Sequence, residues 1–470
     1  MDPTILSTPL VSIDLTFWNE LFNQPTLLLV ESLFSIIGWA ILSLIFFFMG
    51  AELWVSYRQS KYTKKWQWSL LAVDIPPLLV QTPKAVEQIF AHLSGAQTGA
   101  NIGEKYWKGK KQKWFSLEIV SMEGYIQFLI RTEVEFRDLV EASIYAQYPE
   151  AEITEVEDYA DLLPGHYPND KYDVFGLDFG LEAEDPYPIR TYPDFQYNLS
   201  KDAVFSDPMA AILENFSRIG HGENFWMQII IEPTGNKWKE KGIELVKELI
   251  AGGHHHKESI LGSVANVPKY LAQEAINIWD WKFEHEEAHG KEEQPKKISD
   301  LTPGGKTTIE AIENKISKIG FKTKVRVMYV AHKEVYNPSR CVDGLIGALG
   351  QFSIMSSNAL VPKLATKAHY AFADYRTNEK KTLFAGAYKK RKLKAGANPY
   401  IMNIEELATL WHFPLPFVKT PFMQKTETKR GEPPMNLPVE VSEIPLRQKK
   451  KAAVSEEPPE PPAPPPLEYA

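Results

Sequence analysis

Twenty consecutive residues near the N-terminus, from Ser32 to Ala51, carry no charged side chain. A helix that crosses the hydrocarbon core of a bilayer needs about 20 apolar residues, so this run predicts a transmembrane helix, which we place at 27–55. A buried core helix is the alternative, and the length of the run disfavours it. The run also starts too late, and without a basic segment before it, for a cleaved signal peptide.

The charges that flank this run predict its orientation. Residues 1–57 contain neither Lys nor Arg, whereas four basic residues follow between Arg58 and Lys65. Basic residues are enriched in the cytoplasmic segments next to a transmembrane helix. We therefore expect residues 1–26 outside the cytoplasm, a single crossing of the inner (cytoplasmic) membrane, and the large C-terminal part of the chain in the cytoplasm.

Composition describes an ordinary folded protein beyond this helix. The chain has 470 residues, of which 44% are hydrophobic and 24% charged, so it can bury a core. Its net charge of -8 argues against a general coating of polyanions, although local basic patches can still exist. The single cysteine, Cys341, excludes an intrachain disulfide or a multi-cysteine zinc site and fits a reducing compartment.

Residues 66–158 show an alternation of strand and helix patterns. The predicted strands read WQWSLLAVDI, KWFSLEIVS, GYIQFLIRT and AEITEVED, with a hairpin turn at Met122–Gly124 between the second and third. One helix begins at Thr82 and Pro83, which suit its cap and first turn. A second helix, VEFRDLVEASIYAQY, precedes the last strand. The order β-α-β-β-α-β predicts a ferredoxin-like (split βαβ) unit within an α+β fold.

A second unit over 172–430 is predicted to resemble the first, with an interruption. Its strands read YDVFGLDFGL, NFWMQIIIEP and FKTKVRVMYV, and its helices include two that follow Asp207–Pro208 and Asn337–Pro338. A polar insertion at 252–305 separates the second and third of these strands. We expect a second ferredoxin-like (split βαβ) unit that carries this insertion.

The tail from 431 to 470 is rich in proline and ends in EEPPEPPAPPPLEYA. Such a segment buries too little apolar surface to fold, so we expect it to be disordered, with extended or polyproline II conformations. Its P-x-x-P character permits docking to a partner. A solvated spacer is the alternative interpretation.

His285, Glu286 and His289 spell H-E-x-x-H, a pattern in which two histidines on one helix face bind zinc and the glutamate acts as general base. The apolar stripe of the predicted helix ends at Phe283, and His285 lies about 200° around the helix from it. The pair is also surrounded by acidic residues, so we interpret it as a solvated helix end. A zinc hydrolase, and adventitious metal binding assisted by His254–His256, are the alternatives.

Gly305, Lys306 and Thr307 match the end of a phosphate-binding P-loop. The full pattern needs a glycine five residues before Gly305, where Asp300 stands, and no hydrophobic strand leads into the segment. We interpret it as a turn that leads into a helix. We therefore assign no catalytic, cofactor-binding or metal-binding residue, and we expect neither hydrolase nor NTPase activity.

Two segments are rich in basic residues. The first basic segment consists of Lys105, Lys108, Lys110, Lys111 and Lys113. The second basic segment consists of Lys380, Lys381, Lys389, Lys390, Arg391, Lys392 and Lys394. Most charge runs are solvated surfaces, and this is the interpretation we favour. Contact with nucleic acid or with anionic lipid is the alternative.

The segment MNIEELATLWHFP predicts a short helix. Asn403 caps it and Glu406 at the third position completes a capping box. Its apolar face consists of Leu407, Leu410 and Trp411. We expect this helix to dock on the domain, and an exposed helix that binds a partner is the alternative.

Four stretches together resemble a known family. They are SLLAVDIPPLLVQTPKAVEQIFAHL, ENFWMQIIIEP, MNIEELATLWHFP and GEPPMNLP. Over residues 30–438 the chain resembles the membrane-anchored N-terminal region of type IV secretion and conjugation ATPases, of the coupling-protein and HerA-like kind, from small-genome bacteria. In that family a nucleotide-hydrolysing motor would follow. Here a proline-rich tail follows, so no nucleotide-binding residue is carried over.

We therefore expect a non-enzymatic membrane protein, an accessory or assembly component of a type IV secretion-like machine for DNA or protein transfer. Its expected partners are the lipid bilayer and other secretion subunits, above all an ATPase with a similar N-terminal region. A second copy of the chain and nucleic acid are weaker candidates. A membrane scaffold unrelated to secretion, which recruits partners through the tail, is the main alternative. No cofactor is expected.

Overall fold

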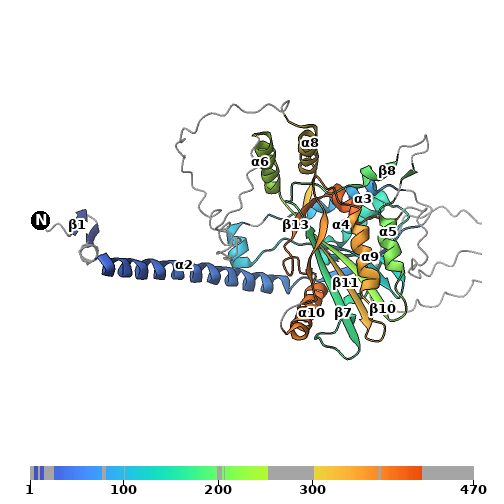
Figure 1. The fold of residues 1–470 in the computed structure, drawn as a ribbon, viewed down its shortest axis with the longest axis horizontal. Helices are drawn as coiled ribbons and strands as arrows, with labels where there is room; N and C mark the ends of the chain where they lie inside the picture. Colours follow the sequence, from blue (N-terminus) through green and yellow to red (C-terminus); the bar gives the residue numbers. More distant parts are fainter. Residues whose placement is uncertain are drawn as a thin grey trace, which may run out of the picture. The chain divides into compact units, whose positions relative to one another are not determined.

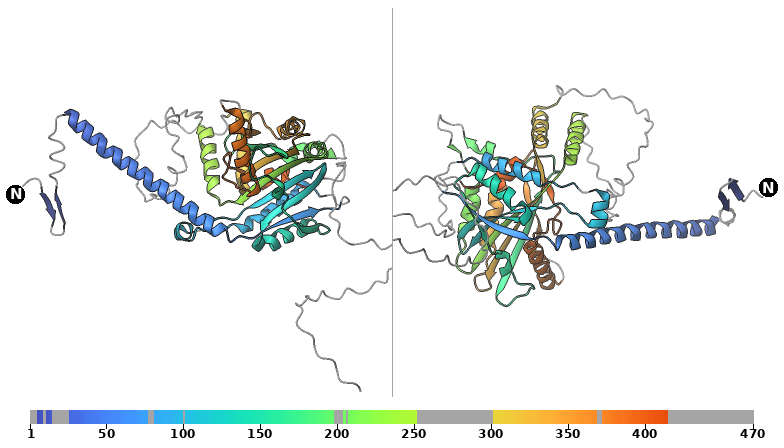
Figure 2. Two further views of the ribbon diagram at one scale, coloured as in Figure 1. Left: turned by 90° about the horizontal axis from the view of Figure 1, so that it is seen from below. Right: turned by 180° about the vertical axis from the view of Figure 1, so that it is seen from behind.

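The structure is a computed structural model. It describes residues 5–8, 11–14, 26–76, 81–99, 101–197, 204–205, 207–251, 301–368 and 372–414. These residues form a mixed α+β fold with an antiparallel sheet and one long N-terminal apolar helix, which confirms the α+β class (Figures 1 and 2). At the N-terminal end, β1 (Ile5–Thr8) pairs antiparallel with β2 (Val11–Asp14), and α2 (Thr26–Thr63) follows.

The main sheet has nine strands within the described residues. They are β3 (Trp68–Asp74), β4 (Phe115–Met122), β5 (Tyr125–Glu133), β6 (Glu152–Val156), β7 (Tyr172–Leu181), β10 (Glu223–Pro233), β11 (Gly320–His332), β12 (Leu360–Ala365) and β13 (Tyr400–Asn403). Their order is β12-β7-β11-β10-β4-β5-β3-β6, and β13 pairs with β11 outside this path. All pairings are antiparallel.

The first half of the sheet contains the predicted strands β3 to β6 and two predicted helices, α3 (Pro83–Leu93) and α4 (Arg137–Gln147). Glu123 and Gly124 have φ of 52° and 95°, the left-handed values that a tight two-residue hairpin turn requires. Pro83 lies in the first turn of α3 as predicted. Thr82 is the N-cap residue as predicted, but its side chain makes no capping hydrogen bond, and its backbone carbonyl accepts the N–H of Ala85.

The second half contains β7, β10 and β11 as predicted. Its helices are α5 (Met209–Ser217), α6 (Lys237–Ala251), α8 (Pro303–Ser317), α9 (Ser339–Gly350), α10 (Ala373–Lys389) and α11 (Ile404–Leu410). Helix α8 begins at Pro303, because Thr302 caps it. Gly305, Lys306 and Thr307 therefore lie inside the helix and not, as predicted from the sequence, in a turn before it. Strands β12 and β13 and helix α10 were not predicted from the sequence. Two short strands, β8 (Gln196–Tyr197) and β9 (Val204–Phe205), pair with each other.

The two halves share one sheet through the pairing of β4 with β10. The paired residues run from Asn224 opposite Met122 to Ile231 opposite Phe115. Both strands are buried along almost their whole length. Such strands, covered on both faces, belong in the middle of a sheet rather than at its edge. The junction between the halves is therefore part of the continuous core.

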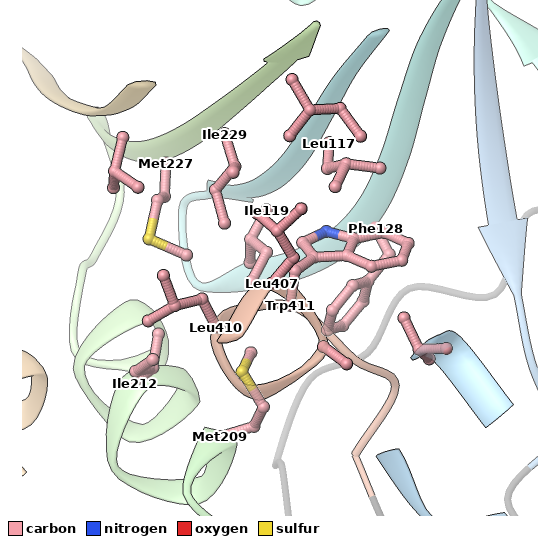
Figure 3. Close-up of a cluster of buried hydrophobic side chains, with 14 of the residues drawn as sticks. Leu117, Ile119, Phe128, Met209, Ile212, Met227, Ile229, Leu407, Leu410 and Trp411 are labelled. Atoms are coloured by element: carbon pink, nitrogen blue, oxygen red, sulfur yellow. The ribbon is translucent and has the colours of Figure 1, made fainter. Parts of the chain in front are cut away.

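Helix α11 closes the larger apolar core. Asn403 and Glu406 form the predicted capping box, which is confirmed, and Trp411 directly after the helix is fully buried. Figure 3 shows Leu407, Leu410 and Trp411 among side chains from both halves, which include Phe128 of β5 and Ile229 of β10. The helix docks on the domain as predicted, and it contacts the two halves at once.

Candidate functional site

Among the described helices, α2 is long and apolar enough to cross a membrane. A signal sequence near an N-terminus can have the same length and apolar composition. Helix α2 is 38 residues long. Within it, the stretch Ile41–Thr63 has a mean hydropathy of 1.4 over its most apolar window, and none of that window is buried by the rest of the chain. Its large side chains are exposed, Phe47 by 71% and Trp39 by 68%. This apolar surface has no cover from the described protein.

A group of three tryptophans connects α2 to the sheet. Trp66 follows the helix after two residues, and its ring lies 5.1 Å from that of Trp114, which precedes β4. Trp68 at the start of β3 lies 5.0 Å from Trp114. Ile230 and Leu393 complete this small apolar core. The short connection and the packed rings fix the end of α2 to the first strand of the domain.

A short helical turn, η2 (Glu104–Lys108), contacts α2 farther along its length. The indole N–H of Trp54 donates to the carbonyl of Tyr106 at 3.0 Å, and the guanidinium of Arg58 donates to the carbonyl of Trp107. The rings of Trp54 and Trp107 lie 6.3 Å apart, edge to face. Gly109 has a left-handed φ of 72°, and a Cβ there would come within 2.4 Å of the backbone of Arg58. The close contact of η2 with α2 therefore requires glycine.

The first basic segment surrounds this contact. Lys113 forms ion pairs with Glu133 and Glu135 on the domain. Lys110 pairs with Glu104 at 3.1 Å, whereas the side chain of Lys108 is 73% exposed with Glu104 at 3.9 Å. The segment therefore changes from paired lysines near the sheet to a solvated lysine on η2.

The second basic segment is only in part the solvated surface that we expected. Arg391 and Lys381 are buried, whereas the other members are exposed: Lys380, Lys389, Lys390, Lys392 and Lys394. Arg391 is fully buried, and its guanidinium makes two hydrogen bonds to Glu118, at 2.9 and 3.0 Å, and two to Asp158. Lys381 pairs with Asp173 at 2.6 Å and Lys389 with Asp161 at 2.7 Å. Charges in this segment are neutralised by carboxylates distant in sequence, which composition alone does not indicate.

The protonation of these groups follows from their pairing. Burial alone would lower the pKa of Arg391, but the carboxylates of Glu118 and Asp158 raise it well above its usual value. Burial alone would raise the pKa of Asp158, and the hydrogen bonds from Arg391 lower it below its usual value. Both partners therefore remain charged across the neutral range, as buried charges must when they hold each other in place.

Glu118 belongs to a row of polar residues that crosses the sheet. Asp178 of β7 lies opposite Arg326 of β11, Arg326 opposite Gln228 of β10, and Gln228 opposite Glu118 of β4. Residues directly opposite each other in a sheet point to the same face. All four are fully buried. We call these residues the polar row, and the row crosses the junction between the two halves.

The segment 389–397, which we call the strap, covers the polar row. Arg391 binds Glu118 at one end of the row. At the other end, Asp178 accepts the N–H of Ala397 at 2.9 Å, and Arg326 donates to the carbonyl of Ala395 at 2.6 Å. Arg326 also donates to Asp178 at 2.7 Å. The strap thus satisfies buried charges contributed by both halves of the sheet.

Lys324 extends the charged cluster under the strap. Its ammonium lies 3.6 Å from Asp178 and donates to the carbonyl of Ala395. Burial lowers the pKa of Lys324 to about 8, although Asp178 opposes this shift. Lys324 therefore loses its charge at a lower pH than an ordinary lysine.

A separate pair of buried charges holds α11. Lys315 of α8 lies 3.1 Å from Glu406, and both side chains are fully buried. Glu406 also accepts the N–H of Ile189 at 3.0 Å. Beyond the helix, His412 contacts Asp207 at 2.9 Å. The charges on this side fix the position of α11, as those on the other side fix the strap.

The motif residues considered in the sequence divide into two groups. His285, Glu286 and His289, His254–His256, Asp300 and the tail at 431–470 lie outside the described residues. Gly305, Lys306 and Thr307 lie in the first turns of α8, where the N–H of Gly305 donates to the capping hydroxyl of Thr302. In the part of the chain that is described, no three His, Cys, Asp or Glu side chains are grouped so that they could hold a metal ion.

Cys341 lies buried in the apolar core. Burial raises the pKa of its thiol to about 11, so the thiol stays protonated at neutral pH. A nucleophilic cysteine needs a thiolate, which a lowered pKa provides. Cys341 therefore acts as a small packing residue.

The polar row was not predicted from the sequence, although charged residues inside apolar strands indicated it. Glu118, Asp178 and Arg326 each stand inside an otherwise apolar strand, in FSLEIVS, FGLDFGL and KVRVMYV. A charged residue in a strand that is buried on both faces needs a partner of opposite charge. A charged residue in an apolar strand therefore indicates a buried network. Only the fold shows which residue it pairs with.

Comparison with known proteins gives a family and no function. A family model described as "Domain of unknown function (DUF8128)" matches residues 77–426. The match covers more than half of the 470 residues and begins after α2 and β3. No curated protein matches the chain.

Proposed function

The chain belongs to the DUF8128 family, and we propose that it is a non-enzymatic, single-pass membrane protein that assembles with a type IV secretion-like machine for DNA or protein transfer. The observation that carries the proposal is the contrast between α2 and the domain attached to it. The domain buries its apolar side chains, whereas α2 leaves Trp39, Phe46 and Phe47 more than half exposed. A lipid bilayer is the environment that would cover such a helix.

We propose that α2 crosses the inner membrane with the domain on the cytoplasmic side. Its charge distribution supports this orientation, because the first basic residue, Arg58, follows the uncharged run. The length of α2 supports a retained anchor over a cleaved signal. A 38-residue helix that ends two residues before Trp66, which packs in the domain, is continuous with the fold. Signal peptides are shorter and are removed.

We infer that each half of the sheet is a ferredoxin-like unit. The four strands of the first half have the spatial order β6-β3-β5-β4, and those of the second half the order β12-β7-β11-β10. In both, the fourth strand lies beside the first, the third comes next and the second is last, with helices after the first and third strands. This order supports two split βαβ units joined through their second strands. A solved structure with another order in either half would contradict the inference.

We propose a structural rather than catalytic role for the domain. Arg391, Glu118, Arg326 and Asp178 are the ionisable groups that a buried site would use, and each is bound to another charge or to the strap. The arrangement supports a function of holding the halves in one rigid body. Such a body would present its surfaces to other subunits.

The partner that we propose is another secretion subunit, above all an ATPase that carries a similar N-terminal region. The outer strands of the sheet support two different expectations. Pro362 in β12 has no N–H, and the pairing of β12 shifts register beside it, so this edge is a poor template for another strand. Strand β6 (Glu152–Val156) contains no proline, so we expect added strands there.

A pull-down in detergent with a tag at Ala470 tests the proposal. Membranes should come from a cell in which the native secretion complex is present and remains intact in the chosen detergent. We expect co-recovery of a secretion ATPase, and its loss when Thr154→Pro removes an N–H from β6. Recovery of the protein alone, with the complex intact in the same extract, would refute the secretion role while leaving the membrane anchor in place.

A further inference from the structure

We propose that the segment 101–111 is a membrane-interface loop that inserts apolar side chains and binds the anionic head groups of the cytoplasmic leaflet. The inference rests on the proposed membrane anchoring of α2, and it names the lipid chemistry that the anchored domain would recognise. It is carried by the depth at which η2 contacts α2, and by the side chains that η2 exposes there.

The depth follows from the length of the uncharged run. Ser32 to Ala51 spans about 30 Å as a helix, which equals the thickness of the hydrocarbon core. Trp54 and Arg58, which hold η2, lie about 5 to 10 Å beyond the end of this run. The head-group region is about 5 to 7.5 Å thick on each side of a bilayer, so Trp54 lies within it and Arg58 just past its outer boundary. A segment fixed to Trp54 and Arg58 therefore lies at the level of the lipid head groups.

The exposed side chains of the loop suit that level. Ile102 is 77% exposed and Trp107 is 69% exposed, and neither is covered by the domain. On α2, Tyr57 is 60% exposed and Trp54 is 45% exposed beside them. Tryptophan and tyrosine are enriched at membrane interfaces, because one end of the ring is apolar and the other forms hydrogen bonds. The aromatic group would otherwise be an exposed apolar patch on a soluble surface.

The charges of the loop fit an anionic surface. Between 101 and 111 the sequence NIGEKYWKGKK contains four lysines and one glutamate, and that glutamate, Glu104, is held by Lys110. Lys108 projects 73% exposed from the same turn as Trp107. Basic residues next to exposed aromatic side chains are the pattern of a segment that binds phosphatidylglycerol-type or phosphatidylserine-type lipids. Nucleic acid would use the lysines, but it would leave Ile102 in water.

The test uses the full-length protein in lipid nanodiscs. In a Cys341→Ala background, Ile102→Cys is labelled with an environment-sensitive fluorophore, and Met355→Cys, at a fully exposed site on the domain, is the matched control. The nanodiscs contain phosphatidylcholine alone, or equal parts of phosphatidylcholine and phosphatidylglycerol, with a nitroxide on some head groups. We expect strong quenching at position 102, greater in the anionic discs, and none at position 355.

Two variants test separately the contact of η2 with α2 and the lysines of the loop. Gly109→Val forces η2 away from the backbone of Arg58, so quenching at position 102 should fall in both kinds of disc. Lys105→Gln with Lys108→Gln should reduce the difference between the discs, since each basic residue changes partitioning to an anionic leaflet about five-fold. Circular dichroism should match that of the parent protein for both, and thermal melting should match for the double lysine variant.

Each other outcome would overturn the inference in a distinguishable way. If the labelled protein enters nanodiscs but the probe at position 102 is not quenched, the loop is not at the interface and the anchor stands. If the protein does not enter nanodiscs, both the anchor and the loop proposal fall. If duplex DNA changes the emission at position 102 and bilayer charge does not, the lysines bind nucleic acid.

Discussion

The two basic segments are similar in sequence, but their central residues have different roles in the fold. In the second, Arg391 is fully buried between Glu118 and Asp158, and its neighbours Lys381 and Lys389 also pair with carboxylates of the domain. In the first, the lysines lie on a turn that contacts α2, and the side chain of Lys108 is largely exposed. A run of basic residues can therefore contain buried side chains paired with carboxylates, or side chains exposed to solvent.

The difference shows what decides the role of such a run. Glu118 is buried in the centre of the sheet, where an uncompensated charge is very unfavourable, so an arginine must reach it. The first segment meets carboxylates of the sheet only at its domain end, where Lys113 pairs with Glu133 and Glu135. On η2 itself, Glu104 pairs with Lys110 and leaves Lys108 largely exposed. Arg391 of the second segment stabilises the domain, whereas the exposed Lys108 of the first is available to the lipid contact that we propose. The following predictions test this division.

The largest expected effect is that of Arg391→Ala. Removing the guanidinium leaves Glu118 buried without a counter-charge, which should lower the free energy of unfolding by about 3–5 kcal/mol. Lys390→Ala is the matched control, because Lys390 is exposed and the change should stay within about 0.5 kcal/mol. Thermal and denaturant unfolding in detergent measure both. Equal stability of the two variants would show that the strap does not hold the sheet.

Arg391→Lys should have an intermediate effect. Lysine keeps the positive charge but cannot make paired hydrogen bonds to both Glu118 and Asp158 from one planar group. We expect a loss of about 1–3 kcal/mol in the same unfolding measurement, because some donors and acceptors become unpaired. A loss as large as that of Arg391→Ala would mean that geometry, rather than charge, stabilises the network.

Lys324 should make stability depend on pH. Burial lowers its pKa from 10.5 to about 8, so between these values the folded protein loses the proton and the unfolded chain keeps it. The unfolded state then binds more protons, and stability should rise with pH from about 8 to 10, by at most about 1.4 kcal/mol per unit. Melting temperatures across this range should show the rise, and Lys324→Met should reduce it. An unchanged slope in Lys324→Met would assign the effect to other groups.

The smallest expected effect on stability is that of Lys108→Gln. The side chain is 73% exposed and its distance to Glu104 is 3.9 Å, so the free energy of unfolding should change by less than about 0.5 kcal/mol. The quenching at position 102 in anionic nanodiscs should nevertheless decrease relative to that in neutral ones. A clear loss of stability would place Lys108 in the structural class of the second segment.

Local patterns in the sequence were sufficient for most elements of the fold. Strands such as β7 and β11, the helices after Pro83 and Pro338, and the capping box at Asn403 were all predicted from spacing and cap residues. These signals are local, because a cap or an apolar alternation involves residues a few positions apart. The missed elements lack them. Strand β12 contains Pro362, and β13 has only four residues.

The contact of Arg391 with Glu118 and the contact of η2 with α2 could not be predicted from local patterns, because they join residues far apart in the sequence. Arg391 follows a run of lysines and looked solvated, and only the fold brings it to Glu118, 273 positions earlier in the chain. The same holds for η2, which contacts α2 because Gly109 permits it. The pairing of β4 with β10 was also unpredictable, since apolar strands do not identify their neighbours. The pairing of strands and side chains that are distant in the sequence was therefore the part of this fold that could not be predicted.

The central claim is that α2 anchors the domain to the cytoplasmic face of a membrane, and a pair of fusions tests it directly. One reporter that is active only in the cytoplasm, and one that is active only in the periplasm, are each fused after Ala470, and their activities are measured in membrane fractions of a bacterial host. We predict activity of the cytoplasmic reporter alone, in the membrane fraction. Activity of the periplasmic reporter alone, or of the cytoplasmic reporter in the soluble fraction only, would contradict the account.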